Sequence, residues 1–151
     1  MKSIEGNFDN PEVDDLLKKH FIELRSVSPA GSTHVLDIDG LKNPSIKFWS
    51  LWENEKLMGC GALKFLNESR GEFKSIRVAD QYRGKGYGKK IIAHLIAEAK
   101  ELKIKKISIE TGSGEFFKSA RILFKNFGFK KCEPFSHYKV CLLYTSPSPR
   151  D

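Results

Sequence analysis

The first part of the chain carries apolar residues at helical spacing. Over residues 11–25 they share one stripe of a helix: Val13, Leu16, Leu17, Phe21 and Leu24. This stripe predicts an amphipathic helix that packs one face against a core. Asp9 or Asn10 precedes Pro11 and supplies a side-chain oxygen that caps a first helical turn. The connection over residues 28–43 is punctuated by Pro and Gly and has room for a short helix.

Extended spacing follows in the middle of the chain. Residues 46–52 and 56–66 are rich in apolar side chains and flank the short polar turn 53–55, which predicts a β-hairpin. Residues 72–78 alternate and predict a further strand. The alternation places Phe73, Ser75 and Arg77 on one face and Lys74, Ile76 and Val78 on the other.

The second half of the chain returns to helices. Six apolar residues recur at helical spacing after position 90: Ile91, Ile92, Leu95, Ile96, Ala99 and Leu102. Residues 106–111 predict a strand with Ile107 and Ile109 on one face. Residues 116–127 have apolar positions at helical intervals, and Gly128 ends that helix. Strands and helices in this order predict an α/β domain.

A glycine-rich run joins the strand at 72–78 to the next helix. Its sequence is Arg83-Gly84-Lys85-Gly86-Tyr87-Gly88-Lys89-Lys90. Alternating glycines permit positive φ and leave no Cβ between backbone N–H groups and a ligand. The following helix presents its unpaired N-terminal donors, and four cations add positive charge. The run is predicted to bind a phosphate group, and the alternative is an ordinary surface turn.

The spacing within this run excludes two common nucleotide motifs. A Walker A loop requires Ser or Thr after its Lys, whereas Lys90 follows Lys89. A Rossmann fingerprint requires two residues between its second and third glycines, whereas Tyr87 alone separates Gly86 from Gly88.

A third motif does fit. The pattern Arg-x-x-Gly-x-Gly, at Arg83, Gly86 and Gly88, resembles the pyrophosphate-binding signature of the GNAT superfamily of acyl-CoA-dependent N-acetyltransferases. Residues 120–129, Ala-Arg-Ile-Leu-Phe-Lys-Asn-Phe-Gly-Phe, resemble the late helix and following strand of the same superfamily. The resemblance implies a central mixed, mostly antiparallel sheet with a splayed strand, flanked by helices on both faces. It also implies acetyl-CoA as co-substrate and direct transfer of the acetyl group to a primary amine in a ternary complex.

The same resemblance implies which residues bind acetyl-CoA. Backbone groups of Ile76, Arg77 and Val78 are expected to hold the pantetheine arm and the thioester carbonyl. The pyrophosphate is expected at the turn, formed by Arg83, Gly84, Lys85, Gly86, Tyr87, Gly88 and Lys89.

Acetyl transfer also needs a base, because only the free amine is nucleophilic. Glu72 lies eleven residues before Arg83, which resembles the spacing of the catalytic glutamate in the histone-acetylating branch. The alternative for Glu72 is an exposed strand carboxylate paired with Lys74 or Arg70. Glu110, at the end of the next strand, is the second candidate.

Two positions depart from the superfamily pattern. Phe124 stands where many members carry a Tyr that protonates the leaving thiolate, and Phe117 stands where an Asn is common. Either the thiolate leaves without a dedicated acid, or another hydroxyl such as Tyr138 replaces it. These departures keep a catalytically inactive CoA-binding module open as an alternative.

The acceptor is the least defined part of the prediction. Residues 28–37, 48–52, 59–64 and 110–114 resemble a bacterial GNAT subgroup labelled as indole-acetate-related acetyltransferases. A small-molecule amine is the predicted acceptor, and a protein or peptide amine is the alternative. Candidates for an acceptor pocket are His34, Asp37, Trp49 and Trp52, although aromatic residues beside a hairpin more often belong to the core.

Composition limits the partners. The net charge is +7, but Lys and Arg are spread along the chain, which favours a solvated basic surface over a nucleic-acid interface. The sequence shows no membrane-spanning run and no signal peptide. Its three cysteines and four histidines lack metal-site spacing. We therefore expect a cytoplasmic protein without a metal, acting as a monomer or homodimer.

The last eleven residues differ from the rest. Residues 141–151 resemble, residue for residue, one translated reading frame of a transposase sequencing adapter. The alternative is a genuine Pro/Ser-rich tail. We therefore expect a GNAT domain over residues 1–140, a non-native tail over 141–151, and a final strand that is missing or replaced. Residues 140–145 are apolar enough to imitate that strand partially.

Overall fold

The computed structural model describes residues 1–27, 38–111, 118–131 and 138–143. The elements in chain order are β1 (Lys2–Glu5), α1 (Pro11–Val27), α2 (Ile38–Leu41), β2 (Ile46–Glu53), β3 (Lys56–Phe65), β4 (Arg70–Val78), the 3₁₀ helix η1 (Asp80–Tyr82), α3 (Tyr87–Glu101), β5 (Lys106–Thr111), α4 (Lys118–Asn126), β6 (Lys130–Lys131) and β7 (Tyr138–Leu143). These strands form one sheet in the order β1-β2-β3-β4-β5-β7-β6. The β4–β5 pair is parallel, and the other pairs are antiparallel.

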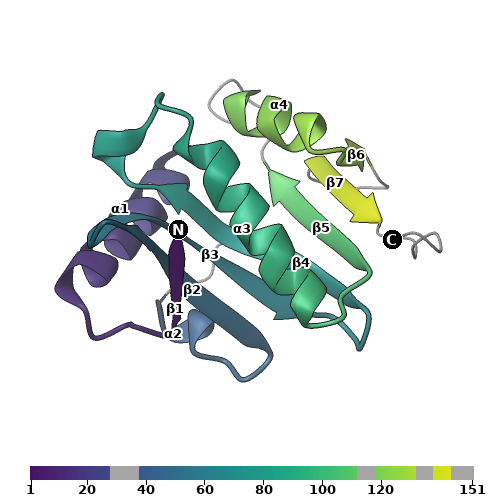
Figure 1. Ribbon diagram of the computed structural model, residues 1–151, viewed down its shortest axis with the longest axis horizontal. Helices are drawn as coiled ribbons and strands as arrows, with labels where there is room; N and C mark the ends of the chain where they lie inside the picture. The colour runs from purple at the N-terminus through teal and green to yellow at the C-terminus, as the bar shows by residue number, and fades with distance from the viewer. Residues whose placement is uncertain (28–37, 112–117, 132–137, 144–151) are drawn as a thin grey trace.

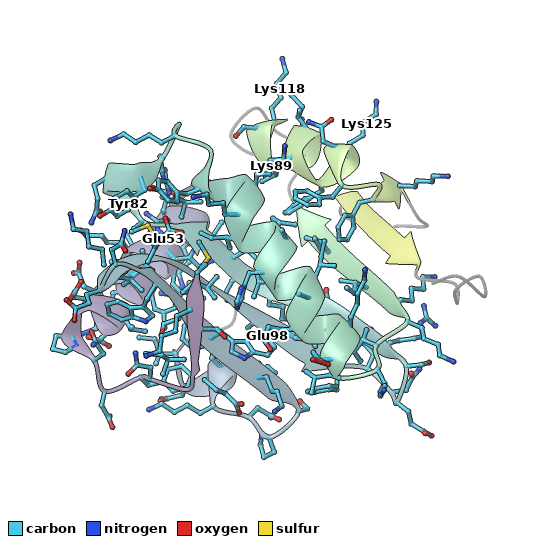
Figure 2. The ribbon with its side chains drawn as sticks, viewed as in Figure 1. Glu53, Tyr82, Lys89, Glu98, Lys118 and Lys125 are labelled. Atoms are coloured by element: carbon cyan, nitrogen blue, oxygen red, sulfur yellow. The ribbon has the colours of Figure 1, made fainter. Side chains whose placement is uncertain are left out.

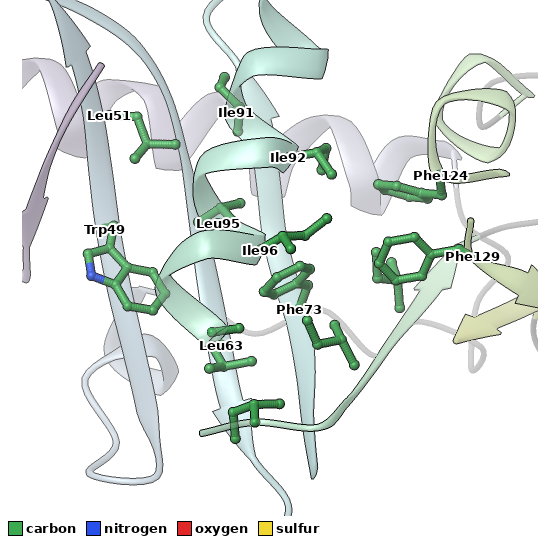
Figure 3. Packing of buried hydrophobic residues seen from close by; sticks show 14 residues of the cluster. Trp49, Leu51, Leu63, Phe73, Ile91, Ile92, Leu95, Ile96, Phe124 and Phe129 are labelled. Atoms are coloured by element: carbon green, nitrogen blue, oxygen red, sulfur yellow. The ribbon is translucent and has the colours of Figure 1, made fainter. Parts of the chain in front are cut away.

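Helices cover both faces of the sheet, as predicted. Figure 1 shows α3 crossing the front face and α1 behind the strands. The core under α3 and α4 includes Trp49, Leu63, Phe73, Leu95 and Phe124, and Figure 3 shows these side chains spread along the layer from Trp49 to Phe124. The core on the other face consists of apolar residues of α1 and α2 packed against β2 and β3. The sheet therefore has a hydrophobic layer on each side.

Local signals in the sequence set several element boundaries. Asn10 caps α1, because its Oδ1 accepts the backbone N–H of Glu12 at 2.8 Å. The hairpin turn places Asn54 and Glu55 at φ of 52° and 63°, the left-handed conformation that matches a tight two-residue turn. The short helix expected between residues 28 and 43 is α2. Strand β1 was not predicted, since its four residues contain a single apolar side chain, Ile4.

The alternation predicted for residues 72–78 is wrong after Ser75. Ile76 and Val78 pack against the same core as Phe73, under α3, whereas Arg77 reaches toward α1. Ser75 has a φ of 54°, and the β3–β4 register shifts between Cys60 and Ala62. This β-bulge adds one residue to β4, so the side chains that follow it change face.

A strand occupies the position between β5 and β6. β7 pairs with β5 from Thr111–Tyr138 to Lys106–Leu143 and with β6 through Lys130–Cys141. The place expected for a missing or replaced final strand is thus filled, and the strand continues three residues past Val140 into the segment 141–151.

Candidate functional site

Strand β4 pairs with β5 over only the first part of its length. Its pairing with β5 runs from Arg70–Lys106 to Phe73–Ile109, but β4 itself continues to Val78. Residues 74–78 therefore have β3 on one side and no paired strand on the other among the described residues. Backbone N–H and C=O groups on that side of the strand have no partner there among the described strands. Ile76, Arg77 and Val78, the residues expected to hold the pantetheine arm, all lie in this unpaired part.

The glycine turn follows β4 and leads directly into α3. Gly86 is the N-cap of α3 with a φ of +84° and ψ of 3°, and no side chain caps the helix. A Cβ built at Gly84 or Gly86 would meet no atom within 4 Å. The turn thus presents uncapped helix donors across open space, which suits a phosphate group. On this geometry the turn fits the pyrophosphate expected from the sequence.

At Gly88 a glycine is needed for close packing rather than for an open turn. A Cβ there would lie 3.2 Å from Cδ2 of Leu123 and 3.7 Å from Cγ2 of Val78. The glycine therefore lets the start of α3 approach α4 and β4 closely, whereas Gly84 and Gly86 keep the turn open.

The cations of the turn fall into two groups. Neither Lys85 nor Lys89 makes an ion pair with any residue in the described part of the chain. Lys90 instead lies 3.4 Å from Glu53 and over the ring of Tyr87. Figure 2 shows Lys89 projecting from the start of α3, with Lys118 and Lys125 projecting from α4. Lys85 and Lys89 are thus the cations left available for an anionic ligand.

Arg83 anchors the turn. Its Nη2 lies 3.2 Å from Oε1 of Glu23 on α1, and its Nε lies 3.4 Å from Oδ1 of Asp80. Arg77, which is 5% exposed, donates to the same two carboxylates at 3.1 and 2.9 Å. Two arginines and two carboxylates therefore join β4, η1, the turn and α1. Sequence reasoning missed both carboxylates, Glu23 and Asp80. The short separation of Asp80 from Arg83 along the chain could have suggested their contact, whereas no local signal points to Glu23.

This ionic cluster sets the protonation of its neighbours. Partial burial would raise the pKa of Glu23, but the hydrogen bond from Arg83 and the charge of Arg77 hold that pKa below its usual value. Burial, helped by the positive charge of Arg77, lowers the pKa of His20 to about 4. His20 Nε2 is buried without a hydrogen-bond partner. Glu23 is therefore ionised and His20 neutral at pH 7.

Glu72 lies near the start of β4, on the face opposite Phe73. It is 8% exposed, and its Oε1 lies 3.6 Å from Nζ of Lys74. The alternative interpretation of Glu72 was an exposed carboxylate paired with Lys74 or Arg70. The pair with Lys74 is present, but the carboxylate is buried. Glu110 lies on β5 opposite Lys139 of β7; its side chain lies outside the described part of the structure.

Several other candidates belong to the core or lie outside the described residues. Phe124 is buried, with its ring 5.7 Å from that of Phe129. Trp49 is also buried in the core, and Trp52 is half-buried and donates from Nε1 to Ser50 Oγ. The candidates that the structure does not describe are His34, Asp37, Phe117 and the side chain of Tyr138.

The described residues contain no group of three or more His, Cys, Asp or Glu side chains arranged to hold a metal ion. Burial raises the pKa of the Cys60 thiol to about 12, so this thiol is protonated at neutral pH. Among the described helices, none is long and apolar enough to span a membrane.

Comparison with known proteins identifies the family. The model of the acetyltransferase (GNAT) family matches residues 11–129. The chain belongs to the GNAT acetyltransferase family. It is 42% identical over 127 residues to the uncharacterized N-acetyltransferase YsnE of Bacillus subtilis, covering 84% of each chain. It is 31% identical over 117 residues to the IAA acetyltransferase of Azospirillum brasilense, covering 76% of this chain and 74% of the relative.

Solved structures share the GNAT fold. An aminoglycoside 6'-N-acetyltransferase complexed with coenzyme A superposes with a TM-score of 0.72 at 13% identity, covering 99% of both chains. The overall fold of this chain is therefore that of a solved acetyltransferase structure.

Proposed function

We propose that this protein transfers the acetyl group of acetyl-CoA to the primary amine of a small molecule. The observation that carries the proposal is the continuity of the unpaired end of β4 with the open glycine turn. Pairing with β5 ends at Phe73, and the turn at Gly84 and Gly86, which follows the rest of β4 and η1, has open space above its backbone. One extended ligand with an amide-bearing arm and a pyrophosphate matches both features.

Each part of this surface has a role in that proposal. Backbone groups of Ile76, Arg77 and Val78 bind the pantetheine arm and polarise the thioester carbonyl. One such donor to a developing oxyanion is worth about 3 kcal/mol. The N–H groups from Arg83 through Lys89 bind the pyrophosphate, with Lys85 and Lys89 adding charge. Arg83 acts through its anchoring contacts to Glu23 and Asp80.

Glu72 is the proposed base that accepts a proton from the incoming ammonium. Its support is its burial, its place on β4 before the bulge and its spacing from the turn. Acetyl-CoA supplies an activated acyl group, and direct attack of the amine on it needs no covalent enzyme intermediate. Phe124 cannot protonate the thiolate, so we propose that CoA leaves as the thiolate. Glu110 is kept as the second candidate base.

A small-molecule acceptor is proposed over a protein amine because the sequence resembles the indole-acetate-related GNAT subgroup and because one relative is named IAA acetyltransferase. The test is incubation with acetyl-CoA and either a mixture of small primary amines or a lysine-containing peptide library. We expect thiol release and N-acetylated products with the small amines. Products from the peptides alone would support protein acetylation, and saturable acetyl-CoA binding without any product would support an inactive binding module.

A further inference from the structure

A row of polar side chains crosses three strands on the face of the sheet opposite α3. Lys64 on β3 pairs in register with Glu72 on β4, and Glu72 pairs in register with Ser108 on β5. Ile107 and Ile109, on either side of Ser108, are in the core under α3, so Ser108 points to the other face with Glu72. Lys74 lies on this face too, opposite Ala62.

This row lies next to the proposed site of acetyl transfer. The Glu72–Ser108 pair is one residue before the last β4–β5 pair, and Ile76 follows Glu72 on the same strand by four residues. A molecule bound at Glu72 would therefore lie beside the point where the β4–β5 pairing ends.

Ser108 carries an unsatisfied hydroxyl in the row. The residue is 5% exposed, and its buried Oγ has no hydrogen-bond partner. Leaving a buried hydroxyl unpaired is unfavourable, and native structures usually satisfy such groups with protein, water or a ligand. A hydroxyl can accept a hydrogen bond from an ammonium while the neighbouring carboxylate of Glu72 accepts a second one.

The charges in the row select among possible amines. Glu72 and Lys74 form a pair at 3.6 Å with side chains only 10% and 17% exposed. A simple monoamine would add an unmatched positive charge beside Lys74 and half-buried Lys64, which a mostly buried site disfavours. An amine that also carries a carboxylate adds no net charge. Its ammonium pairs with Glu72 and Ser108, and its carboxylate pairs with Nζ of Lys74.

We infer that the acceptor is a small zwitterion of the amino-acid type, with its amine held by Glu72 and Ser108 and its carboxylate held by Lys74. This inference rests on the proposed acetyl transfer. Glu72 takes one proton from the ammonium, the free amine nitrogen forms a bond to the acetyl carbon, and the C–S bond breaks with release of the CoA thiolate. The second proton of the nitrogen is lost to solvent as the amide forms. The product is an N-acetyl amino acid whose remaining carboxylate stays paired with Lys74.

The test compares each amino acid with its own carboxamide. The two share the same side chain and amine position, but the amide lacks the negative charge. Because the amine of the amide is less basic, more of it is free at neutral pH, a bias that works against the expected result. We expect wild-type kcat/KM for the acid to exceed that for the amide at least tenfold.

Variants then assign the preference to residues. Lys74→Met should bring the acid-to-amide ratio near one, and Lys74→Arg should keep it, because Arg retains the charge. Lys56→Met, an exposed residue of β3, is the matched control and should leave the ratio unchanged. Ser108→Ala should raise KM for the amino acid without changing KM for acetyl-CoA.

Equal use of acid and amide by the wild-type protein would overturn the inference, and so would an unchanged ratio in a Lys74→Met variant that still melts cooperatively. Acetylation of amines without a carboxylate at equal efficiency would overturn it while leaving the proposed function intact. Failure of every amine, acid or not, to release thiol would instead count against the proposed function itself.

Discussion

The guanidinium of Arg77 donates to the carboxylate of Glu23 at 3.1 Å, joining the bulged end of β4 to α1. The bulge at Ser75 is what turns Arg77 toward that helix. Asp80 and Arg83 complete the cluster, so one set of contacts fixes both the unpaired strand end and the glycine turn. This cluster positions the backbone surface that we propose for acetyl-CoA.

Arg77→Met should destabilise the fold. It removes two charge-assisted hydrogen bonds and leaves Glu23 and Asp80 with Arg83 alone, so we expect the free energy of unfolding to fall by about 2 kcal/mol. Arg83→Met is the matched control, because Arg83 is half exposed, and it should cost less than about 1 kcal/mol. Urea denaturation measures both, and equal losses would contradict the anchoring role of Arg77.

Gly86→Val should weaken acetyl-CoA binding by about tenfold or more, equivalent to about 1.4 kcal/mol. The added side chain fills the open space over the turn, and positive φ strains it by about 1–2 kcal/mol. Gly6→Val is the matched control, since Gly6 has a φ of +83° and equally open space, away from the turn. Calorimetric titration measures both variants, and similar affinities would contradict the assignment of the turn.

His20→Leu should flatten the acid dependence of stability. The pKa of His20 is about 4 in the folded protein and about 6.5 when unfolded. The unfolded chain therefore binds more protons between these values, and stability is lost as the pH falls through that window. The loss should reach about 3 kcal/mol below pH 4. Denaturation of wild type and variant at several pH values checks this, and parallel pH profiles would contradict it.

Glu72→Gln should lower turnover by about a hundredfold at neutral pH, because the amide cannot accept the proton. The defect should shrink as the pH rises, since more of the acceptor is then already a free amine. Glu101→Gln, at the exposed end of α3, is the control. A pH–rate profile for Glu72→Gln that parallels wild type would argue that another group, such as Glu110, is the base.

Much of the fold was predictable because it follows from local patterns. The stripe of α1, the hairpin and the strand at Lys106–Thr111 each arise from apolar spacing and turn residues that act over a few positions. The open conformation of the glycine run was also predictable locally, since it depends on the run's own missing side chains. The family resemblance then supplied the sheet and the splayed strand.

The remaining features depend on contacts between distant segments. The bulge at Ser75 arises where β4 meets β3, so alternation along β4 alone gave the wrong face for Ile76, Arg77 and Val78. Glu23 and Arg77 are 54 positions apart in the sequence, and no sequence pattern near either residue predicts their contact. From the sequence alone Ser108 is an ordinary strand residue. Only the parallel pairing of β4 with β5 shows that it lies beside Glu72.

The central claim is direct transfer of an acetyl group to an amine in a ternary complex. Initial rates of thiol release over a matrix of acetyl-CoA and acceptor concentrations test it most directly. We predict release that requires the acceptor, with double-reciprocal lines that intersect as both substrates are varied. Parallel lines would indicate a covalent acetyl-enzyme, and release that ignores the acceptor would show that the protein does not carry out the transfer; either result would contradict the account.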